Sequence, residues 1–371
     1  MSSIQTEVFS VNDIIQNFCI EGDFSEAKIF GSGHINDTFL VKNTQVDQPD
    51  YLLQRINHHV FKDVSGVIDN IYMVTSHLKN KLREVYGNDV DKRVLSLIPA
   101  KDRKLFVKDS NGNFWRMYIF MTGAKSYDLV TSDKQAREGG RAFGEFQSLL
   151  SDMNPELLSE TIVDFHNIIK RLKDFNIALE NDVMDRKAVI ANEIAFIRKR
   201  EDEMSTIYNW GKAGLIPQRI THNDTKFNNI LFDRDDKAQC IIDLDTVMSG
   251  YIAYDFGDAI RTLINTTVED EQELSKIHLN IPLFKAYTEG YAEKASGFIT
   301  PKEVDSLYYG MMLLPYMQGV RFLTDYLQGD TYFKTAYPEH NLIRTQAQFH
   351  LLSKMEGEKD LLSEIIQESF K

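Results

Sequence analysis

A polar loop flanked by apolar segments, at positions 220–246, constrains the fold of this chain more than any other feature. The loop itself reads Thr-His-Asn-Asp-Thr-Lys-Phe-Asn-Asn (221–229), and an apolar segment, a charged turn and a second apolar segment follow it. This order predicts a β-hairpin whose second strand is buried. The hairpin would carry three polar side chains at its ends: Asp224, Asn229 and Asp243.

These residue types at this spacing are typical of phosphoryl transfer. In that chemistry an Asp accepts the proton of the attacking hydroxyl, an Asn five positions later binds Mg²⁺, and a later strand-end Asp binds the same metal. Mg²⁺ prefers hard oxygen ligands, which a carboxylate and an amide carbonyl supply. The sequence therefore predicts Asp224 as the catalytic base and Asn229 and Asp243 as metal ligands.

Two further residues of the segment belong to the same prediction. Lys226 lies two positions after Asp224, within reach of a γ-phosphate, and is predicted to assist catalysis. Side chains alternate along a strand with a period of two, so Asp245 is expected on the same face as Asp243 and near the metal. Asp and Asn are also common in turns, and the bare pattern arises by chance. The hairpin around it favours the catalytic interpretation.

The length of the chain predicts two lobes. A chain of 371 residues, 43% of them hydrophobic, exceeds the size at which one core usually keeps growing. Strand patterns dominate the first part and helix patterns the remainder. We therefore expect an α+β protein with a β-rich lobe at 1–120 and a larger, mainly helical lobe at 121–371.

A glycine-rich turn separates two predicted strands of the β-rich lobe, 27–30 and 37–41. Backbone N–H groups of such a turn can contact phosphates, so Gly31, Ser32 and Gly33 are predicted to bind nucleotide. A Gly-Ser-Gly turn is ordinarily just a hairpin. Its position ahead of the polar loop favours nucleotide contact.

Arg55 ends the next predicted strand, 51–56, where a cation can hold the α- and β-phosphates. A helix predicted at 65–82 follows, and its Asp69 is one candidate partner for Arg55; the alternative is a surface carboxylate.

Backbone groups of Ile119 and Met121 are predicted to pair with adenine, at the end of this lobe. The strands expected before them lie at 93–98, 105–107 and 115–120, with a hairpin turn at 110–113.

The second part of the chain is expected to be helical apart from the hairpin. Residues 156–210 contain no Gly or Pro, which predicts two long helices. An apolar stripe at helical spacing is interpreted as core packing: Phe165, Ile169, Leu172, Phe175 and Leu179.

The charge of the chain limits its partners. A formal net charge of −13 argues against nucleic acid and anionic membranes, because neither offers a counter-charge to an acidic surface. No segment has the apolar length of a membrane span, no signal-peptide pattern is present, and two cysteines are too few for a disulfide framework. We expect a cytoplasmic protein that acts on a small molecule.

Several motifs together resemble the aminoglycoside phosphotransferase and choline kinase superfamily, and within it the N-acetylhexosamine 1-kinases. The resemblance extends over nearly the whole chain and is closest to the sugar kinases in the Asp-Thr-Lys and Asp-Leu-Asp-Thr-Val-Met runs. The motifs that carry it lie at 31–38, 53–57, 221–229, 242–248 and 321–325.

The resemblance implies a two-lobed, protein-kinase-like fold, Mg-ATP as phosphoryl donor, and the anomeric hydroxyl of N-acetylglucosamine or N-acetylgalactosamine as acceptor. It also implies that His34, Arg321 and Tyr332 line the sugar pocket together with Asp224. The sequence departs from the family pattern at two of the predicted nucleotide-binding positions, which weakens their assignment. The strand cation is Arg55 rather than Lys, and its helix partner would be the shorter Asp69.

Alternative functions remain open on the sequence. One is a kinase of another small alcohol, such as an aminoglycoside, choline or homoserine; another is a non-catalytic, sugar-binding pseudokinase. A protein kinase is disfavoured because the segment 246–253, between the metal-binding Asp and the next predicted helix, is too short for an activation segment. The preferred hexosamine and the oligomeric state stay undetermined.

Overall fold

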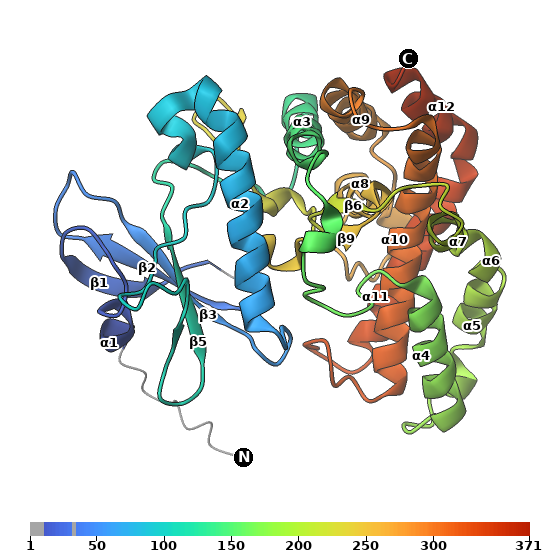
Figure 1. The fold of residues 1–371 in the computed structure, drawn as a ribbon. Coiled ribbons are helices and arrows are strands. Elements are labelled where there is room, and N and C mark those ends of the chain that lie inside the picture. Colours follow the sequence, from blue (N-terminus) through green and yellow to red (C-terminus); the bar gives the residue numbers. More distant parts are fainter. Residues whose placement is uncertain (1–10, 32–34) are drawn as a thin grey trace. The chain divides into compact units, whose positions relative to one another are not determined.

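The computed structural model describes residues 11–31 and 35–371 (Figure 1). The chain divides into two compact units. The first contains the described residues up to Ala124 and the segment Leu158–Ile162, and the second contains Lys125–Leu157 and Val163–Lys371. The expected division after residue 120 lies close to this one, but no sequence pattern indicated that residues 158–162 belong with the first unit.

The first unit is built on a five-stranded antiparallel sheet with strand order β1-β2-β3-β5-β4. Alternate residues of the central strands, among them Leu53 and Trp115, are fully buried and pack against α1 (Val11–Ile15). The strands are β1 (Phe24–Ile29), β2 (Asp37–Asn43), β3 (Tyr51–Ile56), β4 (Val107–Lys108) and β5 (Phe114–Ile119).

One predicted strand of this unit is wrong. Residues 93–98 form only an isolated bridge, between Leu97 and Tyr118, although Ile98 N–H donates to Met117 O at 2.8 Å. Pro99 follows directly and has no N–H to continue the ladder. The strand expected at 105–107 shrinks to the two residues of β4.

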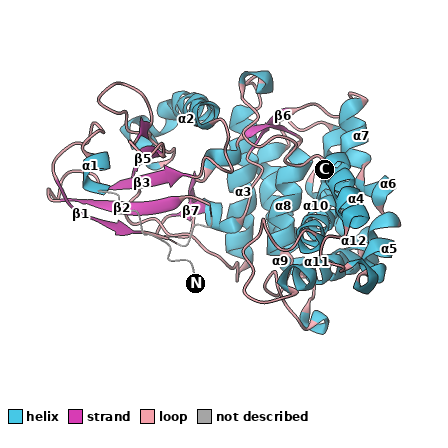
Figure 2. Ribbon diagram, turned by 90° about the horizontal axis from the view of Figure 1, so that it is seen from below, coloured by secondary structure: helices cyan, strands magenta, loops and turns pink. Residues whose placement is uncertain are grey.

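The helix predicted at 65–82 is confirmed as α2 (Val64–Tyr86), which lies along the sheet of its unit (Figures 1 and 2). The Asp63 side chain caps it by accepting from Gly66 N–H. Its apolar positions, such as Val67 and Val74, are buried as the periodicity indicated. A short 3-10 helix, Gly87–Lys92, follows.

The second unit is mostly helical, and the central helix α10 packs against α4, α8, α11 and α12 (Figure 2). Its short strands pair as β6 with β9 and β7 with β8. The strands are β6 (Arg219–Thr221), β7 (Ile230–Phe232), β8 (Ala238–Ile241) and β9 (Met248–Gly250). The helices are α3 (Asp133–Leu150), α4 (Ile168–Asn181), α5 (Ala191–Arg198), α6 (Glu201–Met204), α7 (Thr206–Lys212), α8 (Ile252–Leu263), α9 (Ile281–Ala295), α10 (Pro301–Leu327), α11 (His340–Gly357) and α12 (Lys359–Ser369).

The expectation of two long helices within 156–210 is wrong. After α4 the chain reverses at Asp182, which adopts a left-handed conformation with φ of 37°. The Asp182 carboxylate accepts hydrogen bonds from the N–H groups of Arg186 and Lys187, so a local loop competes with continued helix. The buried stripe also differs by one position, because Ile168 is buried and Ile169 is exposed.

The α+β fold class is confirmed, with a sheet-based first unit and a mainly helical second unit. Within residues 11–31 and 35–371, none of the helices combines the length and the apolar character needed to cross a bilayer.

Candidate active site

The polar loop 222–226 follows strand β6 and is fixed by the imidazole of His222. His222 Nδ1 accepts from the backbone N–H of Asp224 at 3.2 Å, and His222 Nε2 lies 2.8 Å from the carbonyl oxygen of Ile242. Since a carbonyl can only accept, Nε2 donates this hydrogen bond. His222 is fully buried, so its role is to hold the loop rather than to contact a substrate.

Helix α8 holds the same loop through Asp255. The Asp255 carboxylate accepts from the backbone N–H of His222 at 2.9 Å and of Asn223 at 2.7 Å, and also from the Gln147 amide at 2.8 Å. Burial raises the pKa of this carboxyl, and the donated hydrogen bonds oppose that rise. Asn223 is left-handed, with φ of 65°, so the extended backbone of β6 ends before Asp224. Sequence reasoning did not identify Asp255, because it lies 31 positions after Asp224.

Asp224 and Lys226 form a close ion pair. Lys226 Nζ lies 2.9 Å from Asp224 Oδ1, and the two side chains are 46% and 25% exposed. Burial alone would raise the pKa of Asp224, but Lys226 and the neighbouring His222 and Arg261 leave it below its ordinary value. Asp224 is therefore an ionised carboxylate near neutral pH and can accept a proton.

The β7–β8 hairpin brings the predicted metal ligands together. Asn229 Nδ2 donates to the carbonyl oxygen of Asp224 at 2.8 Å, which turns its amide oxygen away from that contact. The N–H of Ile242 donates to Asn229 O at 2.9 Å, so Asp243, the next residue, follows directly beside Asn229. An amide oxygen and a carboxylate at this position fit the oxygen ligands that Mg²⁺ prefers.

Asp245 does not share a strand face with Asp243, contrary to expectation. Strand β8 ends at Ile241, Asp243 is left-handed with φ of 59°, and Asp245 lies in the 3-10 turn Leu244–Thr246. The alternation argument fails because neither Asp is in extended conformation. Asp243 is exposed and Asp245 is 2% exposed.

The described residues contain no group of three His, Cys, Asp or Glu side chains arranged to hold a metal. The candidate ligands here are an amide and two carboxylates, so phosphate and water oxygens would complete a magnesium site.

His166 connects the polar loop to a group of aromatic side chains. Its Nε2 donates to the carbonyl oxygen of Asn223 at 3.1 Å, and its ring lies 4.5 Å from that of Phe165. Burial lowers the pKa of His166 to about 4, with Asp258 opposing the shift and Arg321 and Arg171 adding to it. His166 is thus neutral at pH 7. Sequence reasoning missed it, and it assigned Phe165 to the core.

Arg321, on α10, is surrounded by three aromatic rings, and we call these four residues the Arg321 cluster. The guanidinium carbon lies 5.7 Å from the centre of the Phe165 ring, 6.0 Å from Tyr332 and 5.4 Å from Phe333. Burial lowers the pKa of Arg321. The structure therefore brings together Arg321 and Tyr332, two of the predicted sugar contacts, and Tyr332 is 63% exposed.

The predicted nucleotide residues belong to the first unit. Arg55 forms an ion pair with Asp37, which lies opposite it on β2, with Arg55 Nε 2.7 Å from Asp37 Oδ2. Asp69 is exposed and is not its partner, because the β2–β3 register places a carboxylate nearer. Gly31 is exposed and left-handed, with φ of 76°. Three predicted contacts lie outside the described residues: Ser32, Gly33 and His34.

The two predicted adenine contacts differ in their hydrogen bonding. Ile119 ends β5, and its N–H donates to Ser96 O at 3.0 Å within the unit. Met121 lies beyond the strand, and its carbonyl accepts from Ala124 N–H at 3.4 Å. Met121 is therefore the better candidate of the two for a backbone N–H contact.

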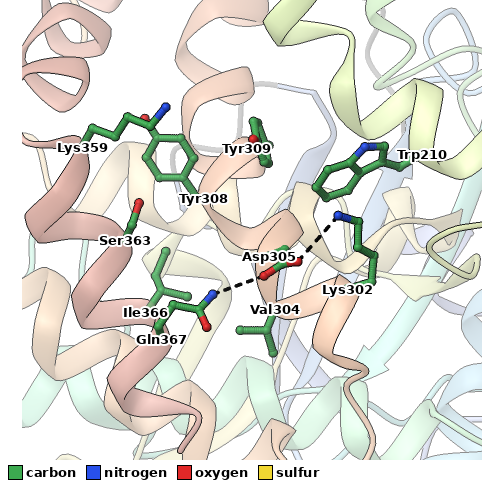
Figure 3. A pocket seen from close by; sticks show the side chains of 10 residues that line it. All are labelled: Trp210, Lys302, Val304, Asp305, Tyr308, Tyr309, Lys359, Ser363, Ile366 and Gln367. Atoms are coloured by element: carbon green, nitrogen blue, oxygen red, sulfur yellow. Dashed lines mark hydrogen bonds and ion pairs between the residues drawn. The ribbon is translucent and has the colours of Figure 1, made fainter.

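A separate pocket of about 280 Å³ lies between α7, α10 and α12 (Figure 3). Lys302 lies over the ring of Trp210, with its Nζ 3.4 Å from the ring centre, and Asp305 contacts both Lys302 and Gln367. The lining contains none of the predicted site residues that the structure describes. It is not part of the arrangement around Asp224.

The fold resembles that of several solved structures. The microcompartment-associated aminopropanol kinase has a TM-score of 0.62 at 14% identity, over 95% of this chain and 98% of that one. An aminoglycoside phosphotransferase from Alicyclobacillus acidocaldarius subsp. acidocaldarius DSM 446 has a TM-score of 0.61 at 9% identity, over 96% of each chain. The choline kinase from Cryptosporidium parvum Iowa II has a TM-score of 0.58 at 14% identity, over 97% of this chain and 99% of that one. At these identities the likeness establishes the kinase-like fold alone.

The sequence also matches a known family directly. The profile of the phosphotransferase enzyme family matches residues 26–293, which contain the glycine-rich turn, the polar loop and the hairpin. This match extends over most of the chain and includes the Asp224, Asn229 and Asp243 constellation. The chain belongs to the phosphotransferase enzyme family.

Proposed function

We propose that the protein is a small-molecule kinase that transfers the γ-phosphoryl group of ATP to the anomeric (C1) hydroxyl of N-acetylglucosamine or N-acetylgalactosamine. The product would be the N-acetylhexosamine 1-phosphate. The arrangement of Asp224, Asn229 and Asp243 around one hairpin carries the kinase assignment. The sugar class rests on the motif resemblance at 224–226 and 243–248 and on the groups around Arg321.

The chemistry follows from the state of Asp224. Its carboxylate is ionised and accepts the proton of the sugar hydroxyl as that oxygen attacks the γ-phosphorus. Lys226 is paired with Asp224 and exposes enough of its chain to contact a phosphate as well. Mg²⁺ held by Asn229 and Asp243, with Asp245 as the further candidate ligand, would neutralise charge on the phosphates.

The nucleotide is proposed to bind residues of the first unit: Gly31, Ser32, Gly33, Arg55, Ile119 and Met121. Arg55 already forms an ion pair with Asp37, with side chains 31% and 55% exposed. A partly exposed pair of this kind contributes little stability, so a phosphate can share or replace it.

The charges around Arg321 favour a neutral acceptor. Burial lowers the pKa of Arg171 to about 10, and the repulsion from Arg321 adds to that shift, so two cations lie near each other. An ammonium acceptor would add a third positive charge, whereas sugar hydroxyls can accept hydrogen bonds from a guanidinium. Arg321, Tyr332 and His34 are the proposed sugar contacts.

Two alternatives compete with this proposal. The similar solved structures include an aminopropanol kinase and a choline kinase, which makes another small alcohol the second candidate acceptor. A non-catalytic sugar-binding protein is the third possibility, but Asp224, Asn229 and Asp243 are all present. Each alternative predicts a different outcome in one assay.

An acceptor panel with ATP and Mg²⁺ tests the proposal. It should contain N-acetylglucosamine, N-acetylgalactosamine, glucose, galactose, 1-amino-2-propanol, choline and an aminoglycoside. We expect phosphorylation of the two N-acetylhexosamines, with ³¹P NMR placing the phosphate on C1 and the reducing end lost.

The Asp224→Asn variant is the matched control, because it removes the proposed base and keeps the size of the side chain. Phosphorylation of choline or aminopropanol in preference to the sugars would replace the sugar assignment with the second candidate. Absence of transfer to every acceptor, with the sugars still binding, would favour the non-catalytic alternative.

A further inference from the structure

A buried carboxylate near the end of α10 accepts four hydrogen bonds, three from the segment that follows the helix and one from α11. Asp325 is 2% exposed. Its Oδ1 accepts from the backbone N–H groups of Thr331 at 2.9 Å and Tyr332 at 2.8 Å. Its Oδ2 accepts from the N–H of Phe333 at 3.0 Å and from the Asn341 amide at 2.9 Å.

This geometry differs from an ordinary helix end. Gly329 and Asp330 are left-handed, with φ of 91° and 59°, and they turn the chain back toward the helix. Three successive N–H groups then converge on one carboxylate, an arrangement in which backbone donors surround an anion. Hydrogen bonds to a charged acceptor are about twice as strong as neutral ones.

Asp325 lies four residues after Arg321 on α10, but the two side chains have different hydrogen-bond partners. An exposed i, i+4 pair would contribute only about 0.3–0.5 kcal/mol. Arg321 instead donates to Gln318 at 3.0 Å, while Asp325 is buried among backbone donors. Arg321 and Asp325 therefore contact different groups, although both lie on α10.

The segment that Asp325 holds completes the Arg321 cluster. Tyr332 and Phe333 supply two of the three rings around the guanidinium. Phe333 also packs on Phe322 of α10, with ring centres 4.7 Å apart. Aromatic rings around a guanidinium restrict its orientation and attract its charge.

The cluster is connected to the catalytic loop through Phe165 and His166. Phe165 is the third ring around Arg321, and His166 beside it donates to the carbonyl oxygen of Asn223, the residue before Asp224. The segment 331–333 is thus connected to the residue before the proposed base by a chain of contacts through Arg321, Phe165 and His166.

We propose that Asp325 is a positioning residue for the acceptor: its carboxylate holds residues 331–333 so that Tyr332 and Phe333 keep Arg321 oriented toward the sugar. The proposal rests on the proposed function, because it assigns the Arg321 cluster to acceptor binding. Asp325 itself touches no substrate.

The test is the Asp325→Asn variant, which keeps the size of the side chain and places an NH₂ group against backbone donors. We expect the KM for N-acetylglucosamine to rise about ten- to a hundredfold while the KM for ATP stays within about twofold. Hydrogen exchange of the amides of Thr331, Tyr332 and Phe333 should accelerate in the same variant, because they lose their acceptor.

Asp109→Asn is the matched control. The Asp109 carboxylate holds the β4–β5 turn by accepting from the N–H groups of Asn111 and Asn113, both at 2.9 Å, and from Trp115 Nε1. Its loss should reduce stability without changing the KM for the sugar. A rise in sugar KM common to both variants would mean general destabilisation and would overturn the proposal.

A double-mutant cycle separates positioning from other effects. If Asp325 acts through the segment, Asp325→Asn should add no further increase in sugar KM when Tyr332 and Phe333 are already Ala. Additive increases would overturn the proposal. If Asp325→Asn does not fold, Asn341→Ala removes the hydrogen bonds from Asn341 to Asp325 and Asp330 and is judged by the KM for the sugar, where an unchanged value would overturn the proposal.

The exchange measurement distinguishes failure of this inference from failure of the proposed function. It needs no substrate, so unchanged amide exchange in Asp325→Asn would overturn the positioning role whatever the acceptor is. If the panel identifies another alcohol, the sugar assignment fails, and the KM comparison is made with that alcohol. An unchanged acceptor KM would then also overturn the inference.

Discussion

Asp224 combines the two properties that a catalytic base requires, an ionised carboxylate and a fixed position. Its backbone N–H is held by His222, and its carboxylate contacts Lys226 and the Asn229 amide. Several independent contacts therefore define where the carboxylate lies.

Asp224→Asn should fold normally and bind ATP but lose turnover. Positioned proton transfer contributes about 10²- to 10⁴-fold, so kcat should fall by at least that range. The measurement is kcat for the best acceptor, with the melting temperature as control. Turnover near the wild-type rate would remove Asp224 from the role of base.

Asp243 and Asp245 should respond differently to substitution. Asp243 is exposed and left-handed, a conformation that Asn tolerates, so Asp243→Asn should abolish Mg²⁺-dependent activity with little change in stability. Asp245 is buried, so Asp245→Ala should lower the free energy of unfolding by about 1–3 kcal/mol. Activity and urea unfolding are compared at saturating Mg²⁺. Greater loss of activity in Asp245→Ala would reverse the ligand assignment.

His166 should make the stability of the protein depend on pH. Its pKa is about 4 in the folded state, against an ordinary value of 6.5, so the stability it contributes is present above pH 6.5 and is lost as pH falls toward 4. His166→Gln keeps a donor for Asn223 O and cannot titrate. The wild type should therefore lose more stability than this variant between pH 6.5 and 4, by up to about 3 kcal/mol. Parallel urea-unfolding profiles over this range would contradict the assignment.

At the scale of elements, the polar loop 222–226 depends on helices that are remote in sequence. Asp255 of α8 holds two loop N–H groups, and Gln147 of α3 holds Asp255. The hydroxyl of Tyr291, on α9, donates to the Gln147 amide oxygen. The close contact of α3 with α9 thus supports the position of the polar loop 222–226.

Gly140→Ala should disturb that contact. A Cβ at Gly140 of α3 would lie 2.0 Å from Tyr287 O and 2.8 Å from Tyr291 N, both backbone atoms of α9. Forcing the helices apart should cost about 1–3 kcal/mol of unfolding free energy and lower kcat through the Gln147–Asp255 contacts. Gly297→Ala is the control, because its Cβ would meet no atom within 4 Å. Equal stability of the two variants would contradict this packing argument.

At the scale of the whole molecule, each unit has a hydrophobic core of its own. The chain contains two tryptophans, and Trp115 lies in the first unit while Trp210 lies in the second. Single-tryptophan variants therefore report on the two units separately.

Gly140→Ala should shift the unfolding of the second unit alone. In a Trp115→Phe background, the fluorescence of Trp210 should report a lower urea midpoint. In a Trp210→Phe background, the urea midpoint reported by Trp115 should not change, because Trp115 lies in the first unit and Gly140 in the second. Equal shifts of both midpoints would show that the chain unfolds as one cooperative unit.

The sequence by itself determined the features that depend on neighbours in the chain. The strands 37–41 and 51–56, the helix that became α2 and the hairpin after Asn229 were all predicted, because periodicity and turn chemistry act over a few residues. The order of Asp224, Asn229 and Asp243 was equally visible, since phosphoryl transfer needs these types at a short spacing.

Only the tertiary structure decided which distant groups hold these residues in place. The partners of Asp255, His166 and Asp325 gave no sequence signal, because they follow from how helices pack rather than from spacing. Two predictions were wrong for the same reason. Residues 93–98 form only one bridge because Pro99 cannot continue the strand pairing. Asp245 does not share a strand face with Asp243 because the left-handed Asp243 interrupts the extended backbone. Backbone hydrogen bonds must be satisfied somewhere, and the folded chain alone determines where.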